Sequence, residues 1–205
     1  MLLPDDALAE LWTLKDASGI RPEWVLPMLY LESGFDPTLQ NRQGAPYYGI
    51  GQDFGPYLTR NGVTPAAYLA MSAAAQLAAI VVPRLEGMVK AYGPLRSATR
   101  VYQANFLPST LRTAPSLISV VAWRGSTAYA SNAMLDASRD GAITVSDLAW
   151  WMATEAAAPE CRAAIARAYV LRPTETPANV VYGLDFVDPL WWLLAPASAA
   201  GYALP

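Results

Sequence analysis

The chain of 205 residues contains no histidine, a single cysteine and few charged residues. Without histidine, neither a Ser-His-Asp triad nor a histidine-based metal site can form. The lone Cys161 excludes an internal disulfide and a cysteine-rich zinc site. Charged residues make up 15% of the chain, against roughly 25% in typical globular domains. With a net charge of -3 and no long Lys/Arg run, we expect no nucleic-acid partner.

Long hydrophobic segments are also lacking. The first twelve residues carry acids where a secretory signal has positive charge and an apolar run, so we expect no signal peptide. The apolar stretches at 73–82 and 190–200 are shorter than the roughly 20 residues of a transmembrane helix, or are broken by proline. We therefore expect no membrane span.

Apolar residues recur at helical spacing over much of the chain. The spacing predicts helices over residues 7–15, 22–33, 73–92 and 95–106. Pro22 suits a first helical position and Gly34 a C-terminal cap, while Pro27 predicts a kink in the second helix. Strand patterns are limited to short runs such as 117–121. The predicted class is mainly α.

Glu32 lies at the end of the second predicted helix, just before a loop over 36–53 that is dense in Pro, Gly, Asn and Gln. Long ordered loops are often functional. The apolar helix before Glu32 and the negative end of the helix dipole both disfavour its charged form, which raises the pKa of its carboxyl. A protonated carboxyl near neutral pH is what a glycosidase needs as its acid. The alternative is a solvated residue at a helix end.

Three sequence blocks give Glu32 a context. They are Leu31-Glu32-Ser33-Gly34-Phe35-Asp36-Pro37 followed by Gly44-Ala45, then Tyr48-Gly49-Ile50-Gly51-Gln52, and finally Val101-Tyr102-Gln103-Ala104-Asn105. In this order they resemble the soluble lytic transglycosylase and goose-type lysozyme-like family over roughly residues 5–110. The chain departs from the family pattern at Ile50 and Gly51, where Leu and Met are usual, and at Gln103 and Asn105, where Asn and Gly are usual.

The resemblance implies a lysozyme-like helical domain that cleaves the glycosidic bond between N-acetylmuramic acid and N-acetylglucosamine. Glu32 would act first as acid and then as base, without a cofactor. Contacts to the peptidoglycan glycan strand would come from Ser33, Tyr48, Gln52, Tyr102 and Gln103. Tyr102 is equally typical of a core aromatic with a satisfied hydroxyl.

A hydrolytic muramidase or endolysin is the close alternative, and it generally needs a second carboxylate about 5 to 9 Å from the first. Asp36 and Asp53 are the candidates. Asp36 precedes a proline and is better suited to capping loop amides. We therefore prefer the transglycosylase. A noncatalytic structural virion protein of the tail or baseplate, with the same fold, is the alternative from another class.

Residues 136–147 match the twelve-residue EF-hand calcium loop, with Gly141 at the sharp turn and Ile143 at the apolar position. Oxygen ligands for a structural Ca²⁺ would come from Asp136, Ser138, Asp140, Ala142 through its carbonyl, Thr144 and Asp147. Ser138 in place of an acid and the short Asp147 depart from the usual pattern. The alternative is a glycine-centred turn between helices.

The predicted organisation is a lysozyme-like transglycosylase domain at 1–130, an EF-hand-like segment at 131–158 and an apolar C-terminal docking tail at 159–205. Cell-wall chemistry without a signal peptide suggests a phage virion enzyme that acts on the bacterial wall in the periplasm. The low charge and the adjacent Trp191 and Trp192 suggest docking to other virion proteins of the tail or baseplate.

Overall fold

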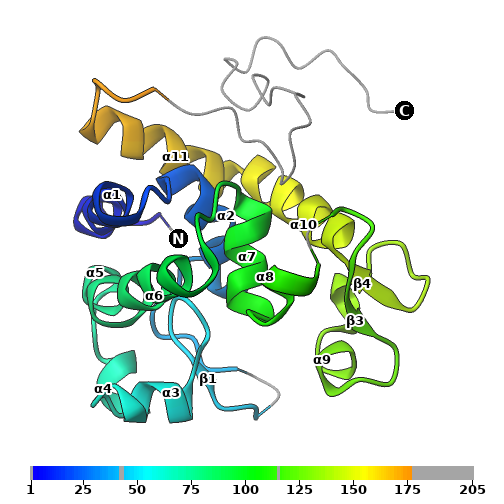
Figure 1. Cartoon of the computed structure of the whole chain (residues 1–205). Helices are drawn as coiled ribbons and strands as arrows, with labels where there is room; N and C mark the ends of the chain where they lie inside the picture. Colours follow the sequence, from blue (N-terminus) through cyan, green and yellow to red (C-terminus); the bar gives the residue numbers. More distant parts are fainter. Residues whose placement is uncertain (1, 42–43, 115, 177–205) are drawn as a thin grey trace.

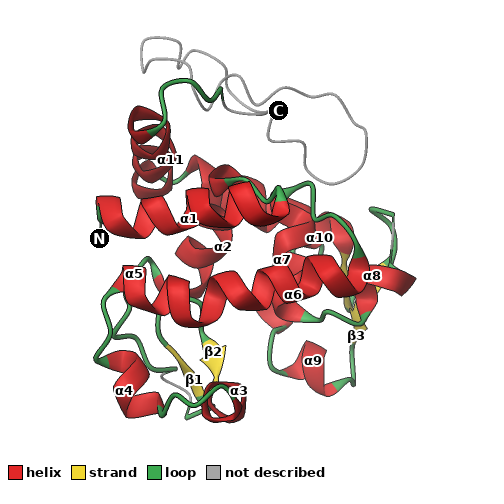
Figure 2. Ribbon diagram, turned by 60° about the vertical axis from the view of Figure 1, so that its left-hand side comes forward, coloured by secondary structure: helices red, strands yellow, loops and turns green. Residues whose placement is uncertain are grey.

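The computed structural model describes residues 2–41, 44–114 and 116–176, and in this part the chain is mainly helical, as predicted (Figures 1 and 2). The α-helices are α1 (Asp5–Ser18), α2 (Pro22–Ser33), α3 (Gly55–Arg60), α4 (Pro65–Leu69), α5 (Ala73–Gln76), α6 (Val82–Tyr92), α7 (Ala98–Phe106), α8 (Thr110–Thr113), α9 (Thr127–Ala130), α10 (Val145–Ala157) and α11 (Pro159–Leu171). A π-helical turn, η1 (Leu77–Val81), and a 3-10 turn, η2 (Ala133–Leu135), complete them. Two antiparallel pairs form the sheets, β1 (Tyr47–Tyr48) with β2 (Asp53–Phe54), and β3 (Val120–Trp123) with β4 (Ala142–Thr144).

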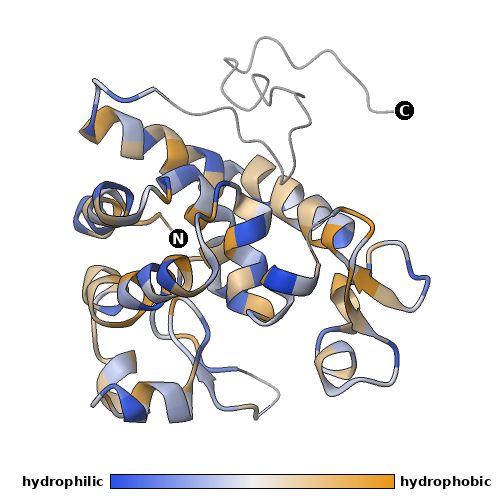
Figure 3. Cartoon of the chain, in the orientation of Figure 1, coloured by the Kyte–Doolittle hydropathy of each residue, from blue (hydrophilic) through white to orange (hydrophobic). Residues whose placement is uncertain are grey.

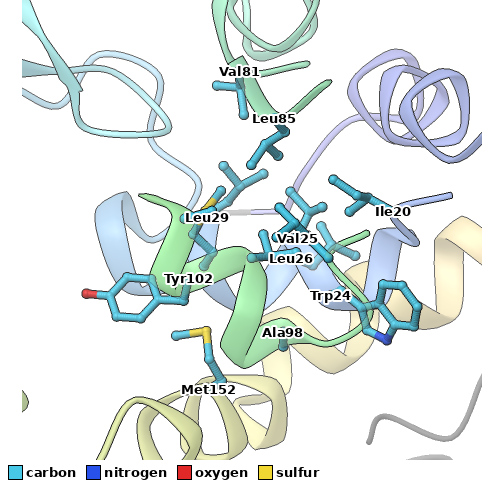
Figure 4. Packing of buried hydrophobic residues seen from close by; sticks show 14 of the residues in the cluster. Ile20, Trp24, Val25, Leu26, Leu29, Val81, Leu85, Ala98, Tyr102 and Met152 are labelled. Carbon is cyan, nitrogen blue, oxygen red and sulfur yellow. The ribbon is translucent and has the colours of Figure 1, made fainter. Parts of the chain in front are cut away.

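Helix α2 lies at the centre of the molecule and contacts α1, α7, α10 and α11 (Figure 1). Its residues from Pro22 to Leu29 are all buried, as expected for a helix that is surrounded on every side. The helix begins with Pro22 in its first turn and continues through Pro27. In Figure 4 its side chains pack against Val81 and Leu85 on one side and Met152 on another. The last turn of α2, which carries Glu32, is therefore held from several directions.

The helical run over residues 73–92 changes geometry before its proline. Helix α5 leads into the π-helical turn η1, and α6 then begins with Pro83 in its first turn. A proline has no N–H to donate, and the first turn of a helix is where a missing N–H breaks no bond. The change of helix type thus allows the helical run to continue past Pro83. Arg84 then lies in the first turn of α6.

The predicted loop at 36–53 contains the short hairpin of β1 and β2, which pairs Tyr47 with Phe54 and Tyr48 with Asp53. Between the two strands, Gly49 has φ 71, and a Cβ there would lie 2.4 Å from Gln76 Oε1 and 2.5 Å from the Tyr68 ring. Only glycine fits this close approach. The hairpin thereby packs closely against α4 and α5.

The packing shows no separate units at the predicted boundaries of 130 and 158. One buried cluster runs from Leu3 to Ala168 and includes residues of α10 and α11. Strands β3 and β4 join residues on both sides of 130, and Figure 3 shows their hydrophobic residues side by side. The described chain is therefore one helical body with a continuous core.

The first part of the predicted docking tail belongs to this body. Helix α11 packs against α1 and α2, and Trp12 Nε1 donates to the Ala168 carbonyl at 3.0 Å. The physical reason is the periodic burial of Cys161, Ala164, Ile165 and Ala168 along one face of α11. Residues 177–205, with Trp191 and Trp192, lie outside the described residues. Within the described ranges, no helix combines the length and apolar character needed to cross a membrane.

Candidate active site at the end of helix α2

The chain turns sharply after Glu32. Gly34 caps α2 with φ 62, and its N–H donates to the Tyr30 carbonyl at 2.7 Å. Phe35 follows with φ 68, a left-handed conformation that is rare for a bulky residue and marks backbone strain. Its ring is 1% exposed and packs on Tyr30, with 5.1 Å between the ring centroids. A buried aromatic thus holds the strained turn next to Glu32.

Burial raises the pKa of the Glu32 carboxyl to about 7, from an ordinary value of 4.5. The positive charge of Arg84 opposes this rise, the negative charge of Asp53 adds to it, and a hydrogen bond from Asn105 lowers the pKa. The residue as a whole is partly exposed, although its carboxyl is desolvated. Near neutral pH, Glu32 is therefore divided between its acid and base forms, which suits proton transfer in both directions.

The three sequence blocks meet at Glu32. Ser33 Oγ donates to the Ile50 carbonyl at 2.9 Å, which joins the end of α2 to the hairpin. Asn105 Nδ2 on α7 donates to Glu32 Oε1 at 2.8 Å. The backbone N–H of Ile50 in turn donates to Gln76 Oε1 at 2.8 Å. Segments far apart in sequence are thus bonded into one site around a single carboxyl group.

Tyr102 on α7 interacts electrostatically with this carboxyl. Its ring is 4% exposed and stacks on Phe106 with centroids 6.3 Å apart. Burial raises the pKa of Tyr102 well above its usual value, and the charges of Glu32 and Glu155 raise it further. In Figure 4 the hydroxyl points away from the labelled apolar side chains. Tyr102 therefore combines a packed ring with a hydroxyl whose ionisation is opposed by the charge of Glu32.

The other predicted contact residues are engaged within the protein. Tyr48 packs against the small cluster of Leu58, Tyr68 and Ile80. Gln52 Nε2 donates to the carbonyls of Leu39, at 3.2 Å, and Gly49, at 3.0 Å. These two side chains brace the hairpin loop beside the site.

Gln103 is placed away from Glu32. It is 0% exposed, and its Nε2 donates to Thr110 Oγ1 at 3.0 Å while its Oε1 accepts from Arg100 at 2.6 Å. Neighbouring residues on a helix point in directions about 100° apart, so Gln103 cannot share the face of Tyr102 and Asn105. The structure therefore gives Gln103 a packing role between α7 and α8 in place of the predicted substrate contact.

Both candidates for a second carboxylate already have partners. Asp36 Oδ1 accepts from the Thr38 N–H at 2.8 Å and from its hydroxyl at 2.7 Å, which confirms the loop-capping role. Asp53 is 4% exposed, lies 3.2 Å from Arg84 Nε and accepts from the Tyr68 hydroxyl at 2.6 Å. Both carboxylates are thus already engaged in contacts within the protein.

Two residues of this site were not among the predicted contacts. Asn105 closes the third block, where its side chain reaches Glu32, and Arg84 donates to Asn105 Oδ1. The signal for Asn105 was its difference from the glycine of the pattern that the third block resembles. Arg84 carried only a weak signal, a cation following an apolar run and a proline.

The predicted calcium loop folds as a turn closed by its own hydrogen bonds. Asp136 Oδ2 accepts from the Gly141 N–H at 2.8 Å and from the Tyr129 hydroxyl at 2.7 Å. Gly141 has φ 96, so the expected sharp turn is present. Asp140 Oδ1 accepts from the Ala142 N–H at 2.9 Å.

The end of the loop starts helix α10. Thr144 and Asp147 form a reciprocal capping box, and Asp147 Oδ1 also accepts from the Ser138 N–H at 3.1 Å. The carboxylates thus point to protein donors, and among the described residues no group of three or more acidic, histidine or cysteine side chains is arranged to hold a metal. The calcium site stays a prediction.

Comparison with known proteins assigns no family to this geometry. No protein-family model matches the chain, and neither a curated protein nor a solved structure matches it. The function must therefore be inferred from the chemistry of the site.

Proposed function

We propose that the protein is a peptidoglycan lytic transglycosylase that cleaves the bond between N-acetylmuramic acid and N-acetylglucosamine, with Glu32 as its only catalytic carboxyl. The observation that carries the proposal is a carboxyl with a pKa of about 7 at the point where the three blocks meet. A helix-end glutamate in solvent would have no such shift. The lysozyme-like character of the helical body is part of the same proposal.

In the first step, protonated Glu32 gives its proton to the glycosidic oxygen as the bond to the muramic carbon C1 breaks. A pKa near the working pH makes the acid available and its conjugate base strong enough for the next step. In that step, ionised Glu32 takes the proton of the muramic 6-hydroxyl, whose oxygen bonds to C1. The products are a free N-acetylglucosamine 4-hydroxyl and a 1,6-anhydromuramic end, and Glu32 is again protonated.

The choice of a lyase over a hydrolase is supported by the partners of the other acids. Asp53 forms an ion pair with Arg84 and accepts from Tyr68, and Asp36 caps its own loop. A hydrolase would need one of them to bind a water or the sugar. Intramolecular attack by the 6-hydroxyl needs neither. Tyr102 and Ser33 flank Glu32 and would adjoin the bound glycan.

The proposed setting is a phage virion, with the enzyme delivered to the cell wall in the periplasm and docked to tail or baseplate proteins. Support for it comes from the low charged fraction and from Trp191 and Trp192, which lie outside the described residues. Detection of the protein in purified particles tests this setting. Its presence only in the lysate of infected cells would favour a free endolysin.

The decisive experiment compares Glu32→Gln with the parent protein for clearing of a purified peptidoglycan suspension. Glu160→Gln is a matched control, because Glu160 accepts from Tyr30 on the same central helix without contacting Glu32. We expect clearing by the parent and the control, and none by Glu32→Gln. Unchanged clearing by Glu32→Gln would refute the assignment, and no clearing by the parent would favour the noncatalytic virion protein.

The products separate the two enzymatic alternatives. Mass spectrometry of the released fragments should show 1,6-anhydromuramic ends, which are lighter by one water than the reducing ends of a hydrolase. Reducing muramic ends would instead identify a muramidase and contradict the single-carboxyl mechanism.

A further inference from the structure

A chain of polar side chains leads from Glu32 into the protein. Asn105 Nδ2 donates to Glu32 Oε1 at 2.8 Å, and Arg84 Nη1 donates to Asn105 Oδ1. Arg84 Nε lies 3.2 Å from Asp53 Oδ1, and Tyr68 donates to Asp53 Oδ2 at 2.6 Å. The members come from α7, α6, β2 and α4, so four elements fix the far side of one carboxyl group.

Two positions where the sequence differs from the pattern it resembles, Asn105 and Gly51, contribute to this chain of side chains. Asn105 supplies an amide where glycine is usual. At Gly51, where methionine is usual, a Cβ would lie 2.8 Å from Asp53 Oδ2 and 3.4 Å from Arg84 Nη2. A side chain at residue 51 would therefore push against the Asp53–Arg84 pair. Gly51 and Asn105, far apart in sequence, therefore serve one arrangement.

The chemistry of the partners sets the direction of the two hydrogen bonds of Asn105. A guanidinium group only donates, so Asn105 must turn its carbonyl oxygen to Arg84 and its NH₂ to Glu32. Oε1 of Glu32 is then always an acceptor. The proton of neutral Glu32 consequently resides on Oε2, the oxygen that Asn105 does not hold. Without Arg84, the Asn105 amide would be free to turn over.

We propose that Asn105 and Arg84 are positioning residues for Glu32, held in register by Asp53 and Tyr68, and that they direct the transferable proton to Oε2. This proposal deepens the proposed function and rests on it only for the identity of the substrate. The arginine contributes twice, since it orients the amide and places a positive charge close to the carboxyl.

The charged and titratable groups around Glu32 predict opposite effects for two variants. Among the described residues, Arg84 on α6 lowers the pKa of Glu32, Asp53 on β2 raises it, and Tyr102 on α7 is a further titratable group that interacts with it. Removal of the arginine charge should raise the pKa of Glu32. Removal of the aspartate charge should lower it, because the positive charge of Arg84 is then no longer balanced.

The experiment follows the carboxyl carbon of Glu32 by NMR during a pH titration of the full chain, with Glu32→Gln used to assign the signal. Arg84→Met should move the titration midpoint upward by about one pH unit or more, the size expected for loss of a nearby opposite charge. Asp53→Asn should move it downward, and the double variant should return close to the parent. Asn105→Leu, at a partly exposed position, should also raise the midpoint.

Arg100→Met is the matched control, since Arg100 is a partly buried arginine on α7 that donates to the Ala114 and Leu111 carbonyls. It should leave the midpoint of Glu32 unchanged. Midpoints that stay constant in Arg84→Met and Asn105→Leu, or that move in the same direction in Arg84→Met and Asp53→Asn, would overturn the proposal. If Arg84→Met does not fold, the titration midpoints of Asn105→Leu and Asp53→Asn still test the proposal.

Activity measurements separate this proposal from the proposed function. If cleavage occurs, the pH at which kcat is half-maximal should follow the NMR midpoint in each variant, with KM little changed. Shifted titration midpoints without any cleavage would support the positioning roles of Asn105 and Arg84 and contradict the proposed transglycosylase activity. Cleavage by variants whose Glu32 titration midpoints do not move would support the transglycosylase and contradict the positioning roles of Asn105 and Arg84.

Discussion

Glu32→Gln should make the protein more stable at neutral pH while abolishing activity. A glutamine keeps the size of the residue and can still accept from Asn105 at 2.8 Å, but it carries no charge to desolvate. The pKa of Glu32 is about 7 in the folded chain, against 4.5 for an ordinary glutamate. Since each pKa unit corresponds to about 1.36 kcal/mol, ionisation of Glu32 lowers the stability of the folded protein by about 3 kcal/mol.

The sign of the pH dependence follows from the raised pKa. Below pH 4.5 the residue is protonated in both the folded and unfolded chains, so the parent and the variant should have similar stability. As pH rises from 4.5 to 7, the unfolded chain ionises first, and the parent loses stability. Above pH 7 the difference between the two proteins should be constant.

Urea unfolding of both proteins at pH 4 and pH 8 measures this difference. At pH 8 we expect Glu32→Gln to be more stable by about 3 kcal/mol, or by about 10 °C in Tm, and at pH 4 by little. Glu175→Gln is a control of opposite sign, because the Lys15 hydrogen bond lowers the pKa of that carboxyl and its removal should reduce stability at pH 8. Equal differences at the two pH values, or a less stable Glu32→Gln at pH 8, would refute a desolvated Glu32 carboxyl with a raised pKa.

Three further predictions concern the hairpin, the catalytic pH range and the calcium loop. Gly49→Ala should lower the free energy of unfolding by more than about 2 kcal/mol, measured in urea, because φ is 71 and the new Cβ would meet Gln76 and Tyr68; a stable variant would contradict the close approach. The rate of peptidoglycan clearing should fall as pH rises above 7, since Glu32 then loses its proton, and a rate that keeps rising to pH 9 would argue against it as the acid. If the loop binds calcium, a chelator should lower Tm, and Asp136→Asn should remove that response; a Tm indifferent to chelator in the parent would refute the calcium site.

The sequence was sufficient for the features that depend on local chemistry. Helical spacing predicted the mainly α class, and Gly34 and Pro22 marked the two ends of α2. Capping chemistry predicted the role of Asp36 in its own loop. The apolar run before Glu32 predicted a raised pKa for its carboxyl, because a helix of such apolar composition is expected to be buried.

Local patterns failed where a side chain's role depends on which face of an element it occupies. Gln103 and Tyr102 are neighbours in one motif, yet Gln103 is bonded to Thr110 in the core, whereas Tyr102 interacts electrostatically with Glu32. The packing of α11 could not be read from the sequence for a similar reason. Its small buried residues became visible as a packing face only once α1 and α2 lay against it.

The sequence by itself determined which residue is the candidate acid and that no histidine can assist it. Only the tertiary structure decided what surrounds that residue. Asn105 is 73 positions from Glu32, and Arg84 is 21 positions from Asn105. Such contacts depend on how α2, α6, α7 and the hairpin pack, and spacing along the chain does not encode that packing. The identity of the acid therefore follows from one helix end, whereas the carboxyl oxygen that carries its proton is determined by tertiary contacts.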